Sequence, residues 1–273
     1  MGNEPNILST PTPWNLVAQG YSRTTMEILG KYSEEAIQRV KPSKDSHLLD
    51  VACGPGTLSL LAAPKVAKVT SVDFSENMLE ILNDKIETSD IPNIETYHGD
   101  GQNLKLADNH FDHAFSMFGL MFFPDRKEGI SELHRTLKPC GTALISSWAP
   151  VDQSPAMLTM FGALQAMNPD IPKPETVIDS LENPEVFEKE LKNAGFEDVT
   201  IQSVSKGFPV NSIEEFWEGM VAGSAPIVMM KNKMGIDEWK EKEKLAIAYL
   251  EKVLPPMPTT LSSDAWFGFG RKS

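Results

Sequence analysis

Apolar runs and helical spacings follow one another along the first half of the chain in a pattern typical of a parallel sheet with connecting helices. Short apolar runs have the length of buried strands, and they cover residues 47–52, 68–73, 94–100, 111–118 and 141–148. Ser75 can cap a helix after the second run, and Asp125 can cap another after the fourth, where Pro139 would stop it. This order predicts an α/β fold with a doubly wound sheet.

The second half of the chain is predicted to add helices and two more strands. Helical patterns cover residues 154–167, 182–196 and a longer insertion at about 212–253. The last two strands are expected at residues 198–205 and 264–272.

The N-terminal region is predicted to be helical after a short irregular segment. The first ~13 residues are rich in Pro, Asn and Thr, which is typical of a loose arm. A helix should follow over about residues 14–40, broken near Gly20 and Gly30.

Composition and charge narrow the classes of partner. The chain has 273 residues, of which 41% are hydrophobic, and its net charge is −13. This negative charge argues against nucleic acid or an anionic membrane as the main partner. No apolar run reaches the length of a membrane span, and the start, "MGNEPNILSTPTPW", has no signal-peptide pattern, so we expect a cytoplasmic protein. His110 and His113 have metal-like spacing without further ligands nearby, so no metal site is expected.

The turn after the first strand, "DVACGPGT" (50–57), is the first candidate for a binding site. Gly54 and Gly56 let the backbone approach a ligand closely. A dinucleotide fingerprint of the NAD type needs a third glycine, and a phosphate-binding P-loop needs a lysine after the glycines; neither is present. The turn therefore belongs to another class of ligand site.

Three acids occur at the ends of the first three predicted strands. They are Asp50, Asp73 and Asp100. Because the carboxyl ends of parallel strands meet at one edge of a sheet, these acids should surround one ligand. Carboxylates suit ammonium, ribose hydroxyl and adenine amino groups, whereas Asp50 would repel a pyrophosphate.

These motifs together resemble class I S-adenosylmethionine-dependent methyltransferases. The family's D-x-G-x-G-x-G is matched by Asp50 to Gly56, with Ala52 in place of the first glycine. The stretch "VTSVDFSENML" resembles the second motif, and "GDGQNLKLADNHFDHAFSMFGLMFFPD" the third and fourth. The resemblance covers residues 47–148 and continues more loosely to the end of the chain.

The resemblance implies roles for particular residues in binding S-adenosylmethionine. Asp73 would accept the two ribose hydroxyls, Phe74 and Met78 would flank the adenine, and Asp100 and the Gly101 backbone would bind its polar edge. The residues that the resemblance places around this cofactor are Tyr21, Asp50, Ala52, Gly54, Gly56, Asp73, Phe74, Met78, Asp100, Gly101 and Met117. Tyr21 and Arg23 could bind the methionine carboxylate if the N-terminal helices fold over the cofactor, or could be ordinary helix residues. Trp14 could likewise belong to the core or to a lid.

The subgroup is suggested by "LHRTLKPCGTALISSW", which is similar to the small-molecule (type 11) methyltransferases that include the menaquinone and ubiquinone enzymes. The resemblance implies a Rossmann-like seven-stranded sheet with the last strand antiparallel and with helical lid insertions. It also implies an N-terminal helical cap (1–46), a cofactor-binding core (47–150), and lid helices and final strands completing the same domain (151–273).

The expected reaction is in-line transfer of a methyl group to a small, hydrophobic acceptor. Methionines gather in the inserted segments, where they could line an acceptor pocket or simply pack the core. We assign no catalytic residue, because His98, His113 and His134 have no supporting motif. Two alternatives stay open, a non-catalytic S-adenosylmethionine-binding module and an NAD-type oxidoreductase. The acceptor, the atom methylated and the oligomeric state are not predicted.

Overall fold

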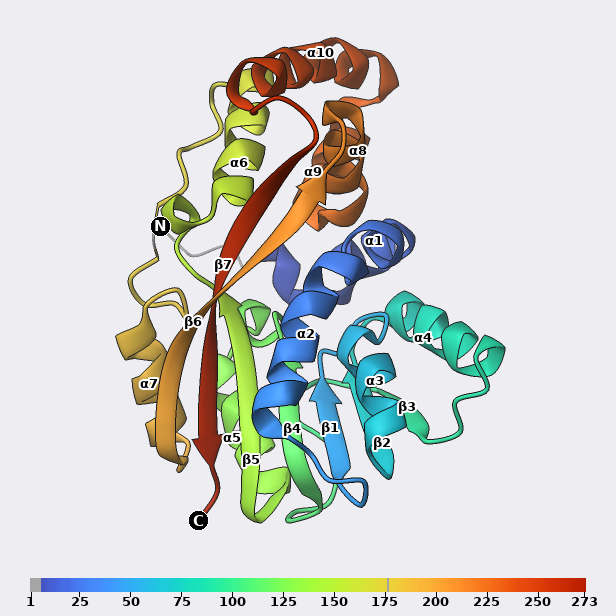
Figure 1. Ribbon diagram of the computed structural model, residues 1–273, viewed down its shortest axis with the longest axis vertical. Helices are drawn as coiled ribbons and strands as arrows, with labels where there is room; N and C mark the ends of the chain where they lie inside the picture. Colours follow the sequence, from blue (N-terminus) through green and yellow to red (C-terminus); the bar gives the residue numbers. More distant parts are fainter. Residues whose placement is uncertain (1–5, 176) are drawn as a thin grey trace.

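One mixed sheet organises the chain. The computed structural model describes residues 6–175 and 177–273, and within these ranges seven strands form a sheet in the order β3-β2-β1-β4-β5-β7-β6 (Figure 1). The strands are β1 (His47–Val51), β2 (Lys68–Asp73), β3 (Ile94–His98), β4 (Phe111–Met117), β5 (Leu137–Trp148), β6 (Glu197–Val210) and β7 (Thr259–Arg271).

Strand direction confirms the predicted topology. The first five strands are parallel, and β7 lies antiparallel between β5 and β6. The chain winds outward from β1 in one direction and from β4 in the other, so the switch point lies between these two neighbours. Ligands of doubly wound sheets bind at the carboxyl ends of the strands at this point.

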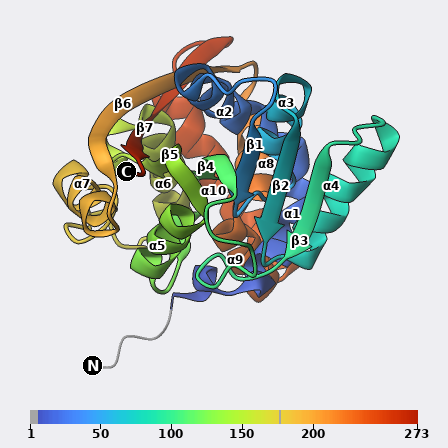
Figure 2. The ribbon, with the colours of Figure 1, turned by 90° about the horizontal axis from the view of Figure 1, so that it is seen from below.

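Helices cover both faces of the sheet (Figure 2). Leu48 packs toward the face covered by α2 and α3, and Leu49 toward the face covered by α5 and α7; both side chains are fully buried. The α-helices are α1 (Pro11–Thr24), α2 (Met26–Val40), α3 (Thr57–Ala62), α4 (Glu76–Thr88), α5 (Arg126–Thr136), α6 (Pro155–Met167), α7 (Pro184–Asn193), α8 (Ile213–Gly223), α9 (Ala225–Met234) and α10 (Ile236–Val253). Short 3-10 turns lie at η1 (Ile7–Ser9), η2 (Ala63–Lys65), η3 (Leu120–Phe122) and η4 (Val151–Gln153).

A helical lid with its own apolar core lies beyond the carboxyl ends of the strands (Figure 1). It consists of α6, α8, α9 and α10, and the long strands β6 and β7 extend into it. Pairing of β6 with β7 continues as far as Val210 and Thr259, and Phe208 and Leu261 from these ends are buried in the lid core. The predicted helical insertion is therefore confirmed, while both strands are longer than their apolar pattern indicated.

The predicted helix breaks at Gly20 and Gly30 are wrong. The helices meet at Thr25, whose N–H still donates to the Tyr21 carbonyl. Gly20 instead lets α1 touch α8, because a Cβ there would lie 2.0 Å from the Ala222 carbonyl oxygen. The glycine serves a close helix–helix contact rather than a bend.

Three further boundaries differ from the prediction. Strand β3 ends at His98, so Asp100 lies in the following turn, and α5 ends at Thr136, so that Pro139 belongs to β5. The loose arm expected at the N-terminus is wrong for residues 6–13, where the Ser9 hydroxyl donates to the Phe122 carbonyl (2.8 Å). Residues 1–5 lie outside the described part of the chain. Among the described helices, none combines the length and apolar composition needed to cross a membrane.

Candidate functional site

A pocket of about 410 Å³ lies at the switch point of the sheet. Its walls come from the turns after β1, β2 and β3, from the end of β4, and from α1, which crosses above them. Nine of the residues predicted from the sequence line it: Tyr21, Ala52, Gly54, Asp73, Phe74, Met78, Asp100, Gly101 and Met117. Side chains from six separate segments thus meet in one place.

The turn after β1 brings its backbone to the pocket through left-handed conformations. Ala52 and Gly54 have φ of 56° and 54°, a region that favours glycine. Ala52 is accommodated because its neighbour Gly119 has no side chain; a Cβ on Gly119 would lie 2.3 Å from that of Ala52. The loss of one glycine from the motif is therefore matched by a glycine after β4.

Gly56 has a different place from the rest of the motif. It precedes α3 with φ of 84°, and a Cβ there would meet Leu82 at 2.3 Å. It is absent from the lining of the pocket. Gly56 therefore permits the left-handed turn and its close packing on α4.

Asp73 organises the floor of the pocket. One carboxylate oxygen accepts from the Gly54 N–H (2.7 Å) and the other from the Ser75 N–H (2.8 Å), so the acid ties two turns together. Burial raises the pKa of Asp73 to about 6, against the lowering effect of these hydrogen bonds. A carboxylate has about four acceptor sites, so two remain for ligand hydroxyls.

Asp50 lies beside the pocket rather than in its wall. It accepts a hydrogen bond from the Ser59 hydroxyl (2.6 Å) and lines a hollow of about 30 Å³. Tyr21, Ala52, Gly54 and Met117 line both this hollow and the larger pocket. Burial, with a smaller contribution from the charge of Asp73, raises the pKa of Asp50 to about 7. The acid can act on a ligand only through this hollow.

The turn after β3 forms the opposite end of the pocket. Asp100 accepts from the Gln102 backbone N–H (2.9 Å), and its carboxylate is exposed. Gly101 has no room for a side chain, since a Cβ would lie 2.6 Å from the Phe123 ring and 2.7 Å from Val51. The Phe123 ring and Val51 therefore pack directly against the Gly101 backbone, which also lines the pocket.

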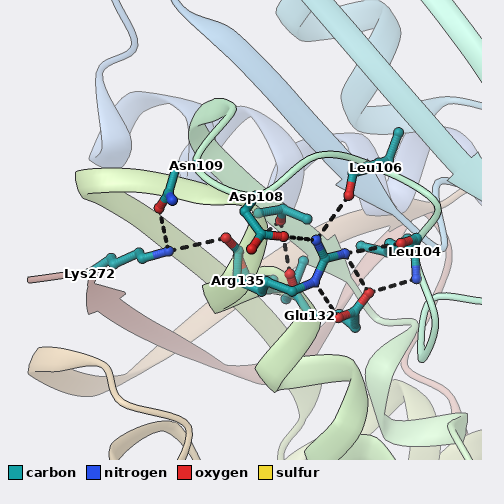
Figure 3. Close-up of polar contacts among 9 residues, drawn as sticks. Leu104, Leu106, Asp108, Asn109, Glu132, Arg135 and Lys272 are labelled. Atoms are coloured by element: carbon teal, nitrogen blue, oxygen red, sulfur yellow. Dashed lines mark hydrogen bonds and ion pairs between the residues drawn. The ribbon is translucent and has the colours of Figure 1, made fainter.

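Arg135 of α5 anchors the chain that follows this turn (Figure 3). Its guanidinium donates to the carbonyls of Leu104 (3.0 Å) and Leu106 (2.9 Å), pairs with Asp108, and forms a two-pronged pair with Glu132. Glu132 in turn accepts from the Leu104 N–H (2.7 Å). This network fixes residues 104–108, directly after the pocket residues Asp100 to Gln102.

Aromatic residues that the sequence analysis did not assign cover the pocket. Phe122 and Phe123 lie in the wall, and the Trp14 ring packs on Phe122 with centroids 5.0 Å apart. Trp14 lines the pocket and also packs on a buried cluster of α1, α4 and α9, so the structure does not decide between its two predicted roles. The run "FGLMFFPD" was the available signal, but only long-range contacts decide which of its rings face a ligand.

The residues present fit an adenosyl group with an amino-acid tail. Two apolar side chains, Phe74 and Met78, the Gly101 backbone and the exposed carboxylate of Asp100 suit a purine ring with an exocyclic amine. Asp73 is placed for ribose hydroxyls at the centre. The charged side chains that line the pocket are carboxylates, where a phosphate site would have basic groups or a nest of backbone amides. The site therefore suits a cationic ligand.

A second, larger pocket of about 1080 Å³ lies beneath the lid. Its apolar wall includes Trp148, Met157, Phe208, Phe216 and Met220. Trp148 stacks on Phe118, with ring centroids 4.1 Å apart, and Phe118 lines the first pocket. One ring of this stacked pair thus lines each pocket. Four of the lid methionines pack in the lid core alone: Met160, Met167, Met230 and Met234.

The candidate histidines do not form a proton-transfer group. His98 lines the first pocket with Nε2 at 3.0 Å from the Phe74 carbonyl, while His113 contacts Thr142 at 2.7 Å and His134 packs on Phe196, both away from it. Within the described residues no group of three or more His, Cys, Asp or Glu side chains could hold a metal.

Known proteins match the part of the chain that builds this pocket. Residues 48–141 match a family described as "Methyltransferase domain". Residues 48–141 are a class I S-adenosylmethionine-dependent methyltransferase domain. The predicted cofactor, S-adenosylmethionine, agrees with this family.

Curated relatives of this methyltransferase domain include a demethylmenaquinone methyltransferase from Listeria welshimeri, 36% identical over 114 residues, which are 41% of this chain and 48% of that protein. The chain therefore spans about half the length of the curated relatives it matches.

Solved structures share the fold of this chain at low sequence identity. A putative methyltransferase from Bacillus halodurans is 20% identical, with a TM-score of 0.57, covering 88% of this chain and 98% of that one. A phosphoethanolamine N-methyltransferase 2 from Haemonchus contortus, solved with phosphomonomethylethanolamine and S-adenosylhomocysteine, is 18% identical with a TM-score of 0.55, covering 89% of this chain and 52% of that one. These likenesses confirm the Rossmann-like fold.

Proposed function

We propose that this chain transfers a methyl group from S-adenosylmethionine to a small, hydrophobic acceptor bound beneath the lid. The observation that carries the proposal is the pair of pockets that Phe118 and Trp148 line, one each, with their rings stacked on each other. The residues of one pocket fit the cofactor. The other pocket is larger, and its lining joins apolar and aromatic side chains with charged ones such as Arg23, Glu27 and Lys31.

The proposed work of the protein is binding, alignment and exclusion of water. When bound, S-adenosylmethionine supplies an electrophilic methyl group that an acceptor atom displaces along the line of the breaking bond. Asp73 would hold the ribose, Asp100 and Gly101 the adenine, and Trp14 and Phe122 would exclude water above them. No side chain is assigned as a base, so acceptors that ionise readily are favoured over aliphatic alcohols.

The acceptor class rests on two kinds of support. The second pocket can take a ring with an apolar substituent. The relatives named demethylmenaquinone methyltransferases act on a compound of that kind by their names. The cytosolic location and the absence of a nucleic-acid partner stay predictions from composition and charge.

Filling the second pocket tests the proposal. Gly219 lines it from α8, and a Cβ there has no neighbour closer than 4.0 Å, so Gly219→Phe should project a ring into the space. We expect this variant to lose transfer to short-chain demethylmenaquinol and aromatic thiols while its Kd for S-adenosylhomocysteine stays within twofold. Gly219→Ala adds only a methyl group and should retain activity.

The same assay separates the two alternatives. Formation of S-adenosylhomocysteine with one of these acceptors by the wild type supports an enzyme. Tight binding of S-adenosylmethionine without turnover of any acceptor would favour a non-catalytic binding module. Binding of NADH would favour an oxidoreductase, against which the missing third glycine argues.

A further inference from the structure

One buried hydroxyl near the cofactor pocket has no hydrogen-bond partner among the described residues. It belongs to Ser33 of α2, which is 1% exposed. A buried hydroxyl without a partner costs stability, and native proteins keep few of them. Ser33 also lies outside the matched domain at residues 48–141.

Ser33 lines the small hollow beside Asp50. The hollow is also lined by Ala52 and Gly54 of the turn after β1 and by Tyr21. These last three residues line the cofactor pocket too, so the hollow opens onto the same turn and the same tyrosine. Thr57 and Cys53 line the hollow as well, and of its polar side chains Ser33 is the one with a buried oxygen that has no hydrogen-bond partner among the described residues.

The size of the hollow limits what it can hold. Its volume of about 30 Å³ is enough for a single water molecule, which needs two to four polar partners. Asp50 has acceptor sites beyond the one used by the Ser59 hydroxyl, and Ser33 can donate. A larger ligand group does not fit.

We propose that Ser33 is a positioning residue for the amino-acid end of the cofactor, acting through one water that it shares with Asp50. The water accepts a hydrogen bond from the Ser33 hydroxyl and one from the ammonium group of the ligand, and it donates to the Asp50 carboxylate. Burial raises the pKa of Asp50, and the nearby ammonium group of the ligand would favour its ionised form. This inference rests on the proposed function, because it needs an adenosyl ligand with an ammonium group.

The expected consequence is selective. Ser33→Ala should weaken S-adenosylhomocysteine about tenfold, as expected for loss of one hydrogen bond in a charged network. It should leave the Kd of 5′-methylthioadenosine, which has the same adenosine and no amino-acid end, within twofold. The ligand-free variant should unfold at the same temperature as the wild type or higher, because the unpaired hydroxyl is removed.

Ser116 of β4 offers a matched control. Its Oγ is also buried without a hydrogen-bond partner among the described residues, and it lines neither the pocket nor the hollow. Ser116→Ala should bind both ligands as the wild type does. Ser33→Cys keeps the volume with weaker hydrogen bonding, so its loss should lie between the wild type and Ser33→Ala.

Calorimetric titration of the full chain and these variants with both ligands tests the role of Ser33 in binding the amino-acid end of the cofactor. Unchanged S-adenosylhomocysteine binding in Ser33→Ala, or equal weakening of both ligands, would overturn the role of Ser33. If the wild type itself binds neither ligand, the proposed function fails instead. Thermal unfolding of each variant shows that it is folded.

Discussion

At the scale of single residues, the chemistry of this site is set by acids held near backbone turns. Asp73 joins the turns after β1 and β2, and its hydrogen bonds to Gly54 and Ser75 place it under the pocket. The acid positions were predictable because a polar residue at the end of an apolar strand is a local pattern, whereas Gly101 followed from the family resemblance alone. The cover formed by Trp14 and Phe122 was not, because no local pattern brings residues 14 and 122 together.

The pair of Ala52 and Gly119 gives the first prediction. Gly119→Ala places two methyl groups in the same space and should destabilise the protein by about 1–3 kcal/mol. Ala52→Gly in the same chain removes the clash, so the double variant should recover most of that loss in denaturant unfolding. A double variant no more stable than Gly119→Ala would contradict this coupling.

The raised pKa values of the buried acids predict how stability depends on pH. With pKa values of about 7 for Asp50 and about 6 for Asp73, the folded chain takes up protons between pH 7.5 and 5, where an unfolded chain with ordinary Asp values does not. The contribution of these two acids to the free energy of unfolding therefore increases as pH falls through this range.

The variant Asp50→Asn isolates this effect. Burial also lowers the pKa of His113 and of His134, and this makes the folded protein less stable as pH falls through the same range. The pH dependence of Tm is therefore compared between the wild type and the variant. The ligand-free Tm of Asp50→Asn should exceed that of wild type most at pH 7.5 and approach it at pH 5. A difference in Tm that does not change with pH would refute the assignment.

At the scale of elements, helix α5 holds the chain after the turn at Asp100 from outside the pocket. Arg135 donates to two backbone carbonyls and pairs with Asp108 and Glu132, through a fork of donors that lysine cannot reproduce (Figure 3). Strand order and the lid helices were predictable from periodicity. The extension of β6 and β7 was not, because many β6 residues in this ribbon are exposed and show no apolar run.

Loosening that anchor should affect every adenine-bearing ligand alike. Arg135→Lys is expected to weaken S-adenosylhomocysteine and 5′-methylthioadenosine by the same factor, about five- to tenfold, because both need the turn at Asp100. Arg126→Lys on the same helix is the control, since Arg126 pairs with Glu190 of α7. Preferential loss of one ligand in Arg135→Lys would contradict the anchoring role.

At the scale of the whole molecule, the sheet presents one pocket at its switch point and the lid adds a second beside it. The first could be expected from the order of strands, because carboxyl ends meet where the winding reverses. The second depends on how α8, α9 and the α1–α2 corner pack together, which the amphipathic patterns alone do not determine.

The measurement that tests the account most directly is calorimetric titration of the wild type and Asp73→Asn with S-adenosylmethionine, S-adenosylhomocysteine and NADH. We predict that the wild type binds one molecule of either adenosyl ligand and no NADH. Asp73→Asn should weaken both adenosyl ligands at least tenfold, because the amide loses acceptor sites for ribose hydroxyls and for the turn. NADH binding by the wild type, or adenosyl binding unchanged in the variant, would contradict the account.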